Sequence, residues 1–166
     1  MDVDIFLFFN RFVGVDKNID LVIYFFAVFA IFLFPLFLIG LRQWRATLYK
    51  CIYALCISYL INALIAFMWY RERPFRVLHS KVLLDTSTLF DSFPSDHAAL
   101  ATCVAVIILF ASRGRGWIAV LLALLIAVSR VFAGVHYPSD VLAGIGVGIL
   151  AALFVEHYIS RKNRLV

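Results

Sequence analysis

Long apolar stretches separated by short polar segments dominate the chain from residue 21 onward. Four of them approach or exceed the roughly 20 apolar residues that cross a hydrocarbon core. They cover about residues 21–41, 51–70, 117–133 and 141–159. A fifth apolar run, 98–111, is shorter and directly follows a polar segment at 93–97. The pattern predicts one integral membrane domain over residues 1–166, an all-α bundle of about five transmembrane helices.

Residues 1–18 follow a different pattern. Apolar residues recur there at helical spacing beside Asp2, Asp4 and Asn10. The segment is too short and too polar to span a membrane, so it predicts a helix lying in the interface. A partial or re-entrant sixth span is the alternative.

Composition supports the membrane assignment. Of the 166 residues, 64% are hydrophobic and 15% are charged, and the mean hydropathy is +0.99, far above that of a soluble domain. No feature of the sequence specifies an oligomeric state. The formal charge of +5 does not indicate a nucleic-acid partner, because the basic residues are scattered between the apolar spans.

The basic residues instead predict a topology. If five spans alternate, eight cations fall on one side: Arg42, Arg45, Lys50, Arg113, Arg115, Arg161, Lys162 and Arg164. The positive-inside rule makes this side cytoplasmic and places the C-terminus there. The polar segments 71–97 and 134–140 then share the outer face.

Polar side chains that are costly to keep in a membrane gather where the third span begins. Segment 93–97 reads Phe-Pro-Ser-Asp-His, and Ser95 or Asp96 is well suited to N-cap the helix. A helix N-terminus presents free backbone amides and the positive end of a dipole, which favours an anion. Plain capping, with His97 as an incidental first-turn residue, is the alternative.

Arginines lie at the outer ends of two other spans. Arg71, Arg73 and Arg76 follow the second span, whose outer half contains Asn62. These arginines alone would suit a solvated rim. Arg130 closes the fourth span, and the cost of a lipid-facing charge predicts that it points inward to an anion or acidic partner. Snorkelling to the interface is the alternative.

The turn after the fourth span contains His136, and Asp140 follows four residues later. If the fifth helix starts near residue 137, this spacing lets the carboxylate meet the imidazole, orient it and favour one tautomer. Two histidines also suggest zinc, but Arg73 and Arg130 would repel a divalent cation and no third ligand has a familiar spacing. We therefore expect neither a metal nor another cofactor.

Arginines gathered around a helix N-terminus favour phosphate, because bidentate guanidinium contacts match its oxygens. Histidines can then supply the chemistry. One can attack phosphorus as an oriented neutral imidazole, while the other, protonated, donates to the leaving oxygen.

In order and spacing, these segments resemble the three-part signature of the type 2 phosphatidic acid phosphatase superfamily over about residues 62–148. The matching positions are Arg73-Pro74, Pro94-Ser95-Asp96-His97, and Ser129-Arg130 followed by His136 and Asp140. The resemblance implies a metal-independent phosphatase in which His136 forms a phosphohistidine and Asp140 orients it. It also implies that His97 protonates the leaving group and later activates water. The phosphoryl oxygens would be held by Arg73, Ser95, Arg130 and the amides near Asp96.

Two positions depart from the family pattern. Family members often have lysine where this chain has Ala66, so Arg71, Arg76 or Lys81 would supply that phosphate contact. Glycine is usual where this chain has Asp96. Both departures resemble the small bacterial undecaprenyl diphosphate phosphatases of the bacitracin-resistance type. A carboxylate beside a phosphate should repel it unless the carboxylate is turned away, paired or protonated, so the charge of Asp96 is left without an explanation.

That subgroup implies hydrolysis of the terminal phosphate of undecaprenyl diphosphate at the outer face of the bacterial cell membrane, for carrier-lipid recycling in wall synthesis. The partners would be a polyprenyl diphosphate and the bilayer, and Asn62 is a further candidate substrate contact. The alternatives are phosphatidate, phosphatidylglycerophosphate or a lipid A phosphate as substrate, and a non-catalytic lipid-phosphate carrier or scaffold. The loop 77–92 is expected to be a lid or binding loop.

Overall fold

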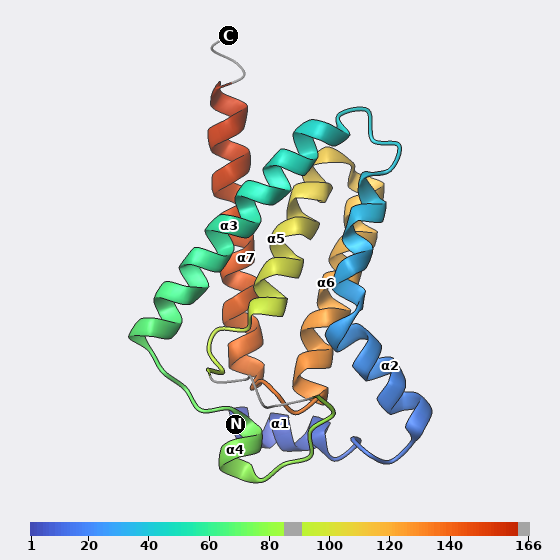
Figure 1. Cartoon of the computed structure of the whole chain (residues 1–166), viewed down its shortest axis with the longest axis vertical. Coiled ribbons are helices and arrows are strands. Elements are labelled where there is room, and N and C mark those ends of the chain that lie inside the picture. The colour runs from blue at the N-terminus through green and yellow to red at the C-terminus, as the bar shows by residue number, and fades with distance from the viewer. Residues whose placement is uncertain (85–90, 163–166) are drawn as a thin grey trace.

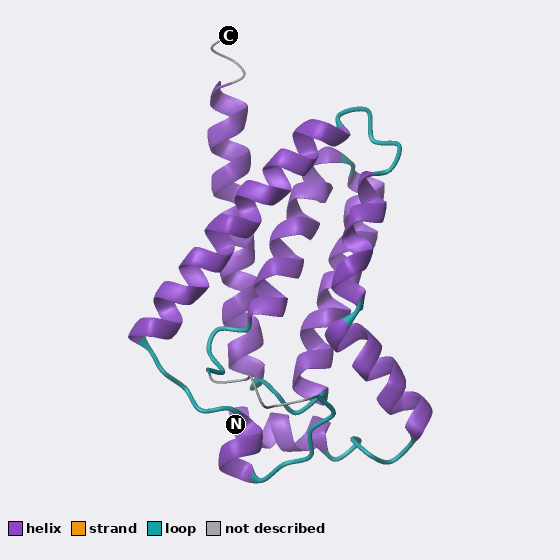
Figure 2. Cartoon of the chain, in the orientation of Figure 1, coloured by secondary structure: helices purple, strands orange, loops and turns teal. Residues whose placement is uncertain are grey.

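The computed structural model describes residues 1–84 and 91–162, with the side chains of residues 159–162 left out. Its elements are α1 (Asp2–Asn10), α2 (Lys17–Val28), the 3-10 helix η1 (Ala30–Leu38), α3 (Trp44–Met68), α4 (Pro74–Leu78), α5 (Asp96–Ala111), α6 (Arg113–Phe132) and α7 (Pro138–Lys162). The only β-type pairing among the described residues is an isolated bridge between Glu72 and Asp91. The predicted all-α bundle is confirmed (Figure 2).

Length and composition qualify three helices, α3, α6 and α7, as membrane spans. The predicted first span is broken instead into α2 and η1, which meet at an angle of 56° and together could form a fourth span. Pro35 lies within η1, where its missing amide hydrogen and its ring oppose a continuous α-helix. α5 has 16 residues, so its length of about 24 Å is less than the roughly 30 Å hydrocarbon core.

α5 is the central helix, and it packs against α3, α6 and α7 (Figure 1). Two glycines of α7 bring the α7 and α5 backbones close together. A Cβ at Gly144 would lie 2.4 Å from the carbonyl oxygen of Ser95, and one at Gly148 would lie 2.4 Å from that of Ala99. This packing fixes the start of α5 beside the start of α7.

Different segments lie at the two ends of the bundle. α1 and α4 lie across the end where α5 and α7 begin and α6 finishes, whereas the other end carries the start of α3 and the turn between α5 and α6 (Figure 1). The nine residues of α1 are too few to span a membrane. The segments that the sequence assigned to one face therefore meet at one end of the bundle. Residues 85–90, which include Asp85 and the middle of the expected lid, lie outside the described residues.

Candidate active site

His136 lies in the turn between α6 and α7 and is 2% exposed. Its Nδ1 is 2.7 Å from the carbonyl oxygen of Ser92. Because a carbonyl oxygen can only accept, Nδ1 carries the proton and Nε2 carries the lone pair. That lone pair accepts a hydrogen bond from Nη1 of Arg73 at 3.2 Å.

Burial, together with the charges of Arg130 and Arg73, lowers the pKa of His136 to about 4, although the Asp140 carboxylate opposes the shift. The imidazole is therefore neutral near pH 7. A neutral histidine whose Nε2 carries no proton is the form that can act as a nucleophile.

Asp140 lies beside this ring, but the direct hydrogen bond that we expected from the sequence is made by another residue. Its Oδ2 is 3.8 Å from Nδ1 of His136, which is too long for a hydrogen bond. The same oxygen accepts from Ser92 Oγ at 2.5 Å and from the Tyr137 amide at 2.8 Å. α7 begins at Pro138, so His136 precedes the helix and the carboxylate folds back onto the first turn.

Ser92 therefore connects the two groups, since its carbonyl oxygen holds His136 and its hydroxyl holds Asp140. It is fully buried. Sequence reasoning missed this serine, because a serine just before the Phe93-Pro94 dipeptide has no distinctive spacing from either partner. Its role depends on a contact between segments that are more than 40 residues apart.

Three buried residues from different elements lie around this histidine. Arg73 is the N-cap of α4, Ser95 is the N-cap of α5, and Arg130 lies in the last turn of α6. Arg73 donates from Nη1 to the carbonyl oxygen of Val135 at 3.0 Å, and Arg130 donates from Nη1 to that of Ala27 at 2.7 Å. These carbonyl contacts fix the guanidinium groups without neutralising their charge.

Each of the three residues has one buried polar atom without a hydrogen-bond partner among the described residues: Arg73 Nε, Ser95 Oγ and Arg130 Nε. An unpaired buried polar atom costs about 1–3 kcal/mol. Ser95 occupies the N-cap position, but its hydroxyl makes no capping hydrogen bond, so plain capping does not account for it. Two guanidinium N–H groups and one hydroxyl suit an anion with several acceptor oxygens, such as a phosphoryl group.

His97 lies in the first turn of α5 and is partly buried. His97 lies close enough to Arg130, His136 and Arg73 for all three to affect its pKa, so it belongs to the same cluster. Burial and the two guanidinium charges lower the pKa of His97, and the negative charge of a bound phosphoryl group would oppose this shift. Proton transfer between His97 and a bound group stays a prediction.

Asp96 is exposed, and its carboxylate is tied to α3. Its Oδ1 accepts a hydrogen bond from Nδ2 of Asn62 at 2.8 Å. Asn62 is 2% exposed, so it is a fixed anchor. The Asp96 charge also acts on Arg73 and Arg130. Pairing with Asn62 and proximity to two cations thus explain how a carboxylate is accommodated here.

The other three candidate contacts have different surroundings. Arg71 pairs with Asp2 at 2.7 Å and with Asp140 at 2.6 Å. Lys81 is directed to the N-terminal segment, where its Nζ donates to the carbonyl oxygen of Val13 at 2.8 Å. Arg76 is exposed on α4. A direct substrate contact of each of these three residues stays a prediction.

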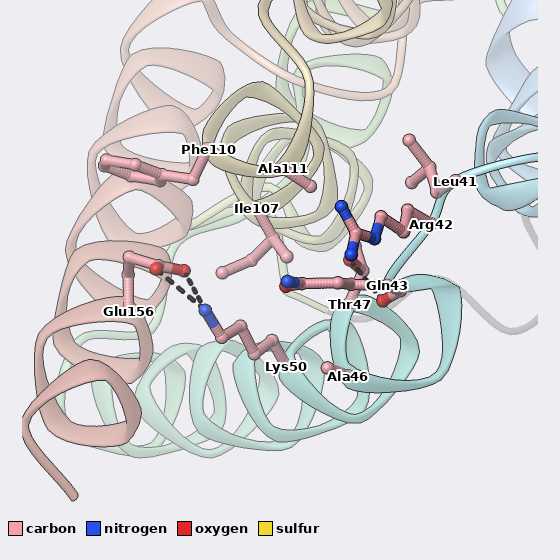
Figure 3. Close-up of a pocket in the computed structure, with 10 residues that line it drawn as sticks. All are labelled: Leu41, Arg42, Gln43, Ala46, Thr47, Lys50, Ile107, Phe110, Ala111 and Glu156. Atoms are coloured by element: carbon pink, nitrogen blue, oxygen red, sulfur yellow. Dashed lines mark hydrogen bonds and ion pairs between the residues drawn. The ribbon is translucent and has the colours of Figure 1, made fainter. Parts of the chain in front are cut away.

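A polar cavity of about 340 Å³ lies at the opposite end of the bundle (Figure 3). Lys50 on α3 and Glu156 on α7 face each other in it, with Nζ 2.8 and 2.9 Å from the two carboxylate oxygens. The residues that line the cavity include no histidine. No group of three or more metal-binding side chains occurs within the described ranges. The predicted catalytic residues His97 and His136 lie at the other end of the bundle.

Comparisons with known proteins agree with this arrangement. The model of the PAP2 superfamily matches residues 47–164. The bacitracin transport permease protein BcrC of Bacillus licheniformis is 29% identical over 160 residues, which are 93% of this chain and 79% of the relative. Undecaprenyl-diphosphatase BcrC of Bacillus subtilis is 37% identical over 123 residues, which are 74% of this chain and 63% of that protein.

Two solved structures share the fold. The crystal structure of Aquifex aeolicus LpxE superposes with a TM-score of 0.78 at 26% identity, covering 94% of each chain. A transmembrane PAP2-type phosphatidylglycerolphosphate phosphatase from Bacillus subtilis superposes with a TM-score of 0.68 at 22% identity, covering 96% of this chain and 94% of that one. At this identity the second likeness concerns the fold alone.

Proposed function

Because the chain belongs to the PAP2 superfamily, we propose that it removes the terminal phosphate of undecaprenyl diphosphate and leaves undecaprenyl phosphate. The observation that carries this proposal is the set of three unpaired buried atoms on Arg73, Ser95 and Arg130 next to neutral His136. The similarity to undecaprenyl-diphosphatase BcrC of Bacillus subtilis supports undecaprenyl diphosphate as the substrate. Hydrolysis would recycle the carrier lipid for cell-wall synthesis.

In the proposed reaction, Nε2 of His136 attacks the terminal phosphorus as the bond from phosphorus to the bridging oxygen breaks. The departing lipid monophosphate takes a proton from His97. The resulting phosphohistidine keeps its Nδ1 proton on the Ser92 carbonyl oxygen, and its positive charge lies near Asp140. Water then gives a proton to His97 and attacks phosphorus, which releases phosphate and restores neutral His136.

Arginine contributes most when charge spreads over the phosphoryl oxygens. Nη1 of Arg73 is 3.2 Å from Nε2 of His136, so a phosphorus approaching Nε2 brings its oxygens to this guanidinium. Arg130 and Ser95 supply donors from two other elements. Donors fixed before the reaction stabilise the transition state without reorganising.

The orientation in the membrane is part of the proposal. Five of the eight cations lie in the start of α3, in the loop just before it and in the start of α6. These segments are at the end of the bundle opposite His136 (Figure 1). Under the positive-inside rule, that end and the C-terminus are cytoplasmic. The active site then faces outward in a bacterial cell membrane.

A phosphate-release assay with purified protein in a chelating buffer tests the proposed function. The substrates are undecaprenyl diphosphate, phosphatidate, phosphatidylglycerophosphate and a lipid A phosphate, offered singly and in competition. We expect the largest kcat/KM with undecaprenyl diphosphate. Preference for another of these lipids would move the substrate assignment, and no release from any of them would contradict the phosphatase.

The low pKa of His136 gives a prediction that needs no substrate. A group with a pKa of about 4 is unprotonated above that pH and gains a proton only as the pH falls through it. We expect the ring signals of His136 in an NMR titration to stay constant from pH 7 to pH 5, with the His136→Gln spectrum identifying them. A midpoint near 6.5, the ordinary histidine value, would contradict the buried neutral nucleophile.

The Asn62–Asp96 hydrogen bond predicts a change in substrate affinity. In Asn62→Leu the Asp96 carboxylate loses its anchor and can turn towards the bound phosphate, so we expect KM to rise about tenfold with little change in kcat. Adding Asp96→Asn should restore KM, because the freed side chain no longer carries charge. An unchanged KM in Asn62→Leu, measured by the same phosphate-release assay, would refute this explanation of Asp96.

A further inference from the structure

The first turn of α1 contacts the first turn of α7 through Asp2. Its Oδ1 accepts from the Ser139 amide at 3.1 Å, and its Oδ2 accepts from the Ser139 hydroxyl at 2.6 Å. These hydrogen bonds join residues that are 137 positions apart. Asp2 therefore supplies to α7 the acceptors that a helix N-terminus needs.

Arg71 extends this contact to Asp140. Its Nη2 donates to Oδ2 of Asp2 at 2.7 Å, and its Nη1 donates to Oδ1 of Asp140 and to Oγ of Ser139, each at 2.6 Å. Its guanidinium carbon lies 4.0 Å from the centroid of the Tyr137 ring. Burial opposes the charge of Arg71, but the carboxylates of Asp2 and Asp140 raise its pKa overall.

The chain of contacts ends at the nucleophile. Asp140 accepts from Ser92 Oγ at 2.5 Å, and the Ser92 carbonyl oxygen accepts the Nδ1 proton of His136 at 2.7 Å. The Ser92 amide in turn donates to the carbonyl oxygen of Arg71 at 2.9 Å. Charge-assisted hydrogen bonds, which are stronger than neutral ones, thus connect Asp2 through Arg71 and Asp140 to the Ser92 hydroxyl. A neutral hydrogen bond from the imidazole to the Ser92 carbonyl oxygen completes the connection.

We propose that Asp2 is a positioning residue for phosphoryl transfer, which holds Asp140 through Arg71 and Ser139 and thereby orients His136. The proposal rests on the proposed function only for its kinetic consequence. α1 is then part of the catalytic apparatus and not simply an interfacial anchor. Arg71 binds carboxylates in this arrangement and does not replace the missing lysine contact to phosphate.

The sequence offers a matched control within the same helix. Asp4 is also a carboxylate of the first turn of α1, but its side chain is 81% exposed and pairs with the N-terminal amine. Asp2→Asn and Asp4→Asn remove the same charge from the same element. A general effect of α1 on folding or membrane seating would appear in both variants, whereas a positioning effect would appear only in Asp2→Asn.

The experiment compares full-length wild type, Asp2→Asn, Asp4→Asn, Arg71→Gln and the double variant Asp2→Asn/Arg71→Gln, each with any tag at the C-terminus. We expect Asp2→Asn to lower kcat about tenfold with KM nearly unchanged, and Asp4→Asn to behave as wild type. A small displacement of a reacting group can cost up to about a hundredfold. The double variant should be no slower than Arg71→Gln, because both changes break one network.

The NMR signals of the His136 ring provide a readout that does not depend on activity. They should shift in Asp2→Asn and not in Asp4→Asn. Equal kcat in Asp2→Asn and Asp4→Asn, an effect of Asp2→Asn on KM alone, or identical His136 ring signals in these two variants would each overturn the positioning role. If the wild type releases no phosphate but the ring signals still shift in Asp2→Asn alone, the proposed function is contradicted and the network is supported.

Discussion

Replacing His136 with glutamine is expected to lower phosphate release by at least about 10⁴-fold, because the variant lacks the nucleophile of the first step. Binding should persist, since Arg73, Ser95 and Arg130 are unchanged. The measurement is kcat with undecaprenyl diphosphate, together with the affinity for a non-hydrolysable diphosphate analogue.

His157→Gln is the matched control. His157 is exposed near the other end of α7, so its replacement should leave kcat unchanged. Turnover by the wild type would exclude a non-catalytic carrier. Binding without turnover in His136→Gln would then show that this histidine is needed for the chemistry and not for binding. Phosphate release at the wild-type rate by His136→Gln would remove His136 from the mechanism.

The second large effect is expected from Arg130→Lys, which keeps the charge but removes the planar guanidinium. Arg130 is 3% exposed, its Nη1 is committed to the Ala27 carbonyl oxygen, and its Nε has no partner among the described residues. Lysine cannot satisfy the carbonyl and a phosphoryl oxygen with the same geometry. We expect kcat/KM to fall by about 100-fold, comparable to the loss of one donor to a developing oxyanion.

Arg113→Lys is a control from the same helix. Arg113 begins α6 at the end opposite the active site and is exposed, so kcat/KM should not change. The assay is phosphate release at low substrate concentration, with circular dichroism to verify the helical fold of both variants. Full activity in Arg130→Lys would show that charge alone suffices and would contradict a directional role for its N–H groups.

The hydropathy pattern and the three polar segments were sufficient to predict much of this molecule. A membrane span is recognised from a local run of apolar residues, so the ends of α6 and α7 and the end of α3 were predicted to within a few residues. The start of α3 was not, because the helix begins at Trp44 and not near residue 51. His136, His97, Arg73 and Arg130 were predicted to share one face, because each lies at a span end whose side follows from alternation. The structure brings all four into one cluster.

Contacts between distant polar segments were not predictable in the same way. The position of Asp140 four residues after His136 predicted a direct hydrogen bond, but Ser92 lies between them, and nothing local specifies which of several serines approaches α7. Asp2 likewise reads as one acidic residue of an interfacial helix until the fold brings it to Ser139 and Arg71. Sequence patterns indicate which face a side chain occupies, whereas hydrogen-bond partners depend on how separate segments meet.

The puzzle of Asp96 has a similar origin. Its carboxylate appeared to oppose phosphate binding because its partner, Asn62, lies 34 residues earlier on another helix. The sequence makes Asn62 a candidate substrate contact, and its observed hydrogen bond indicates a role through Asp96. A direct contact of Asn62 with lipid stays a prediction.

The most direct test of the central claim is to trap the covalent intermediate. Purified protein is mixed with undecaprenyl diphosphate, quenched in alkali at a series of short times, and digested for mass spectrometry of the peptide that contains residue 136. We predict one added phosphoryl group on His136, appearing before phosphate accumulates and absent from His136→Gln. Steady phosphate release with no phosphorylated His136 at any time, or phosphorylation of His97 instead, would contradict the account.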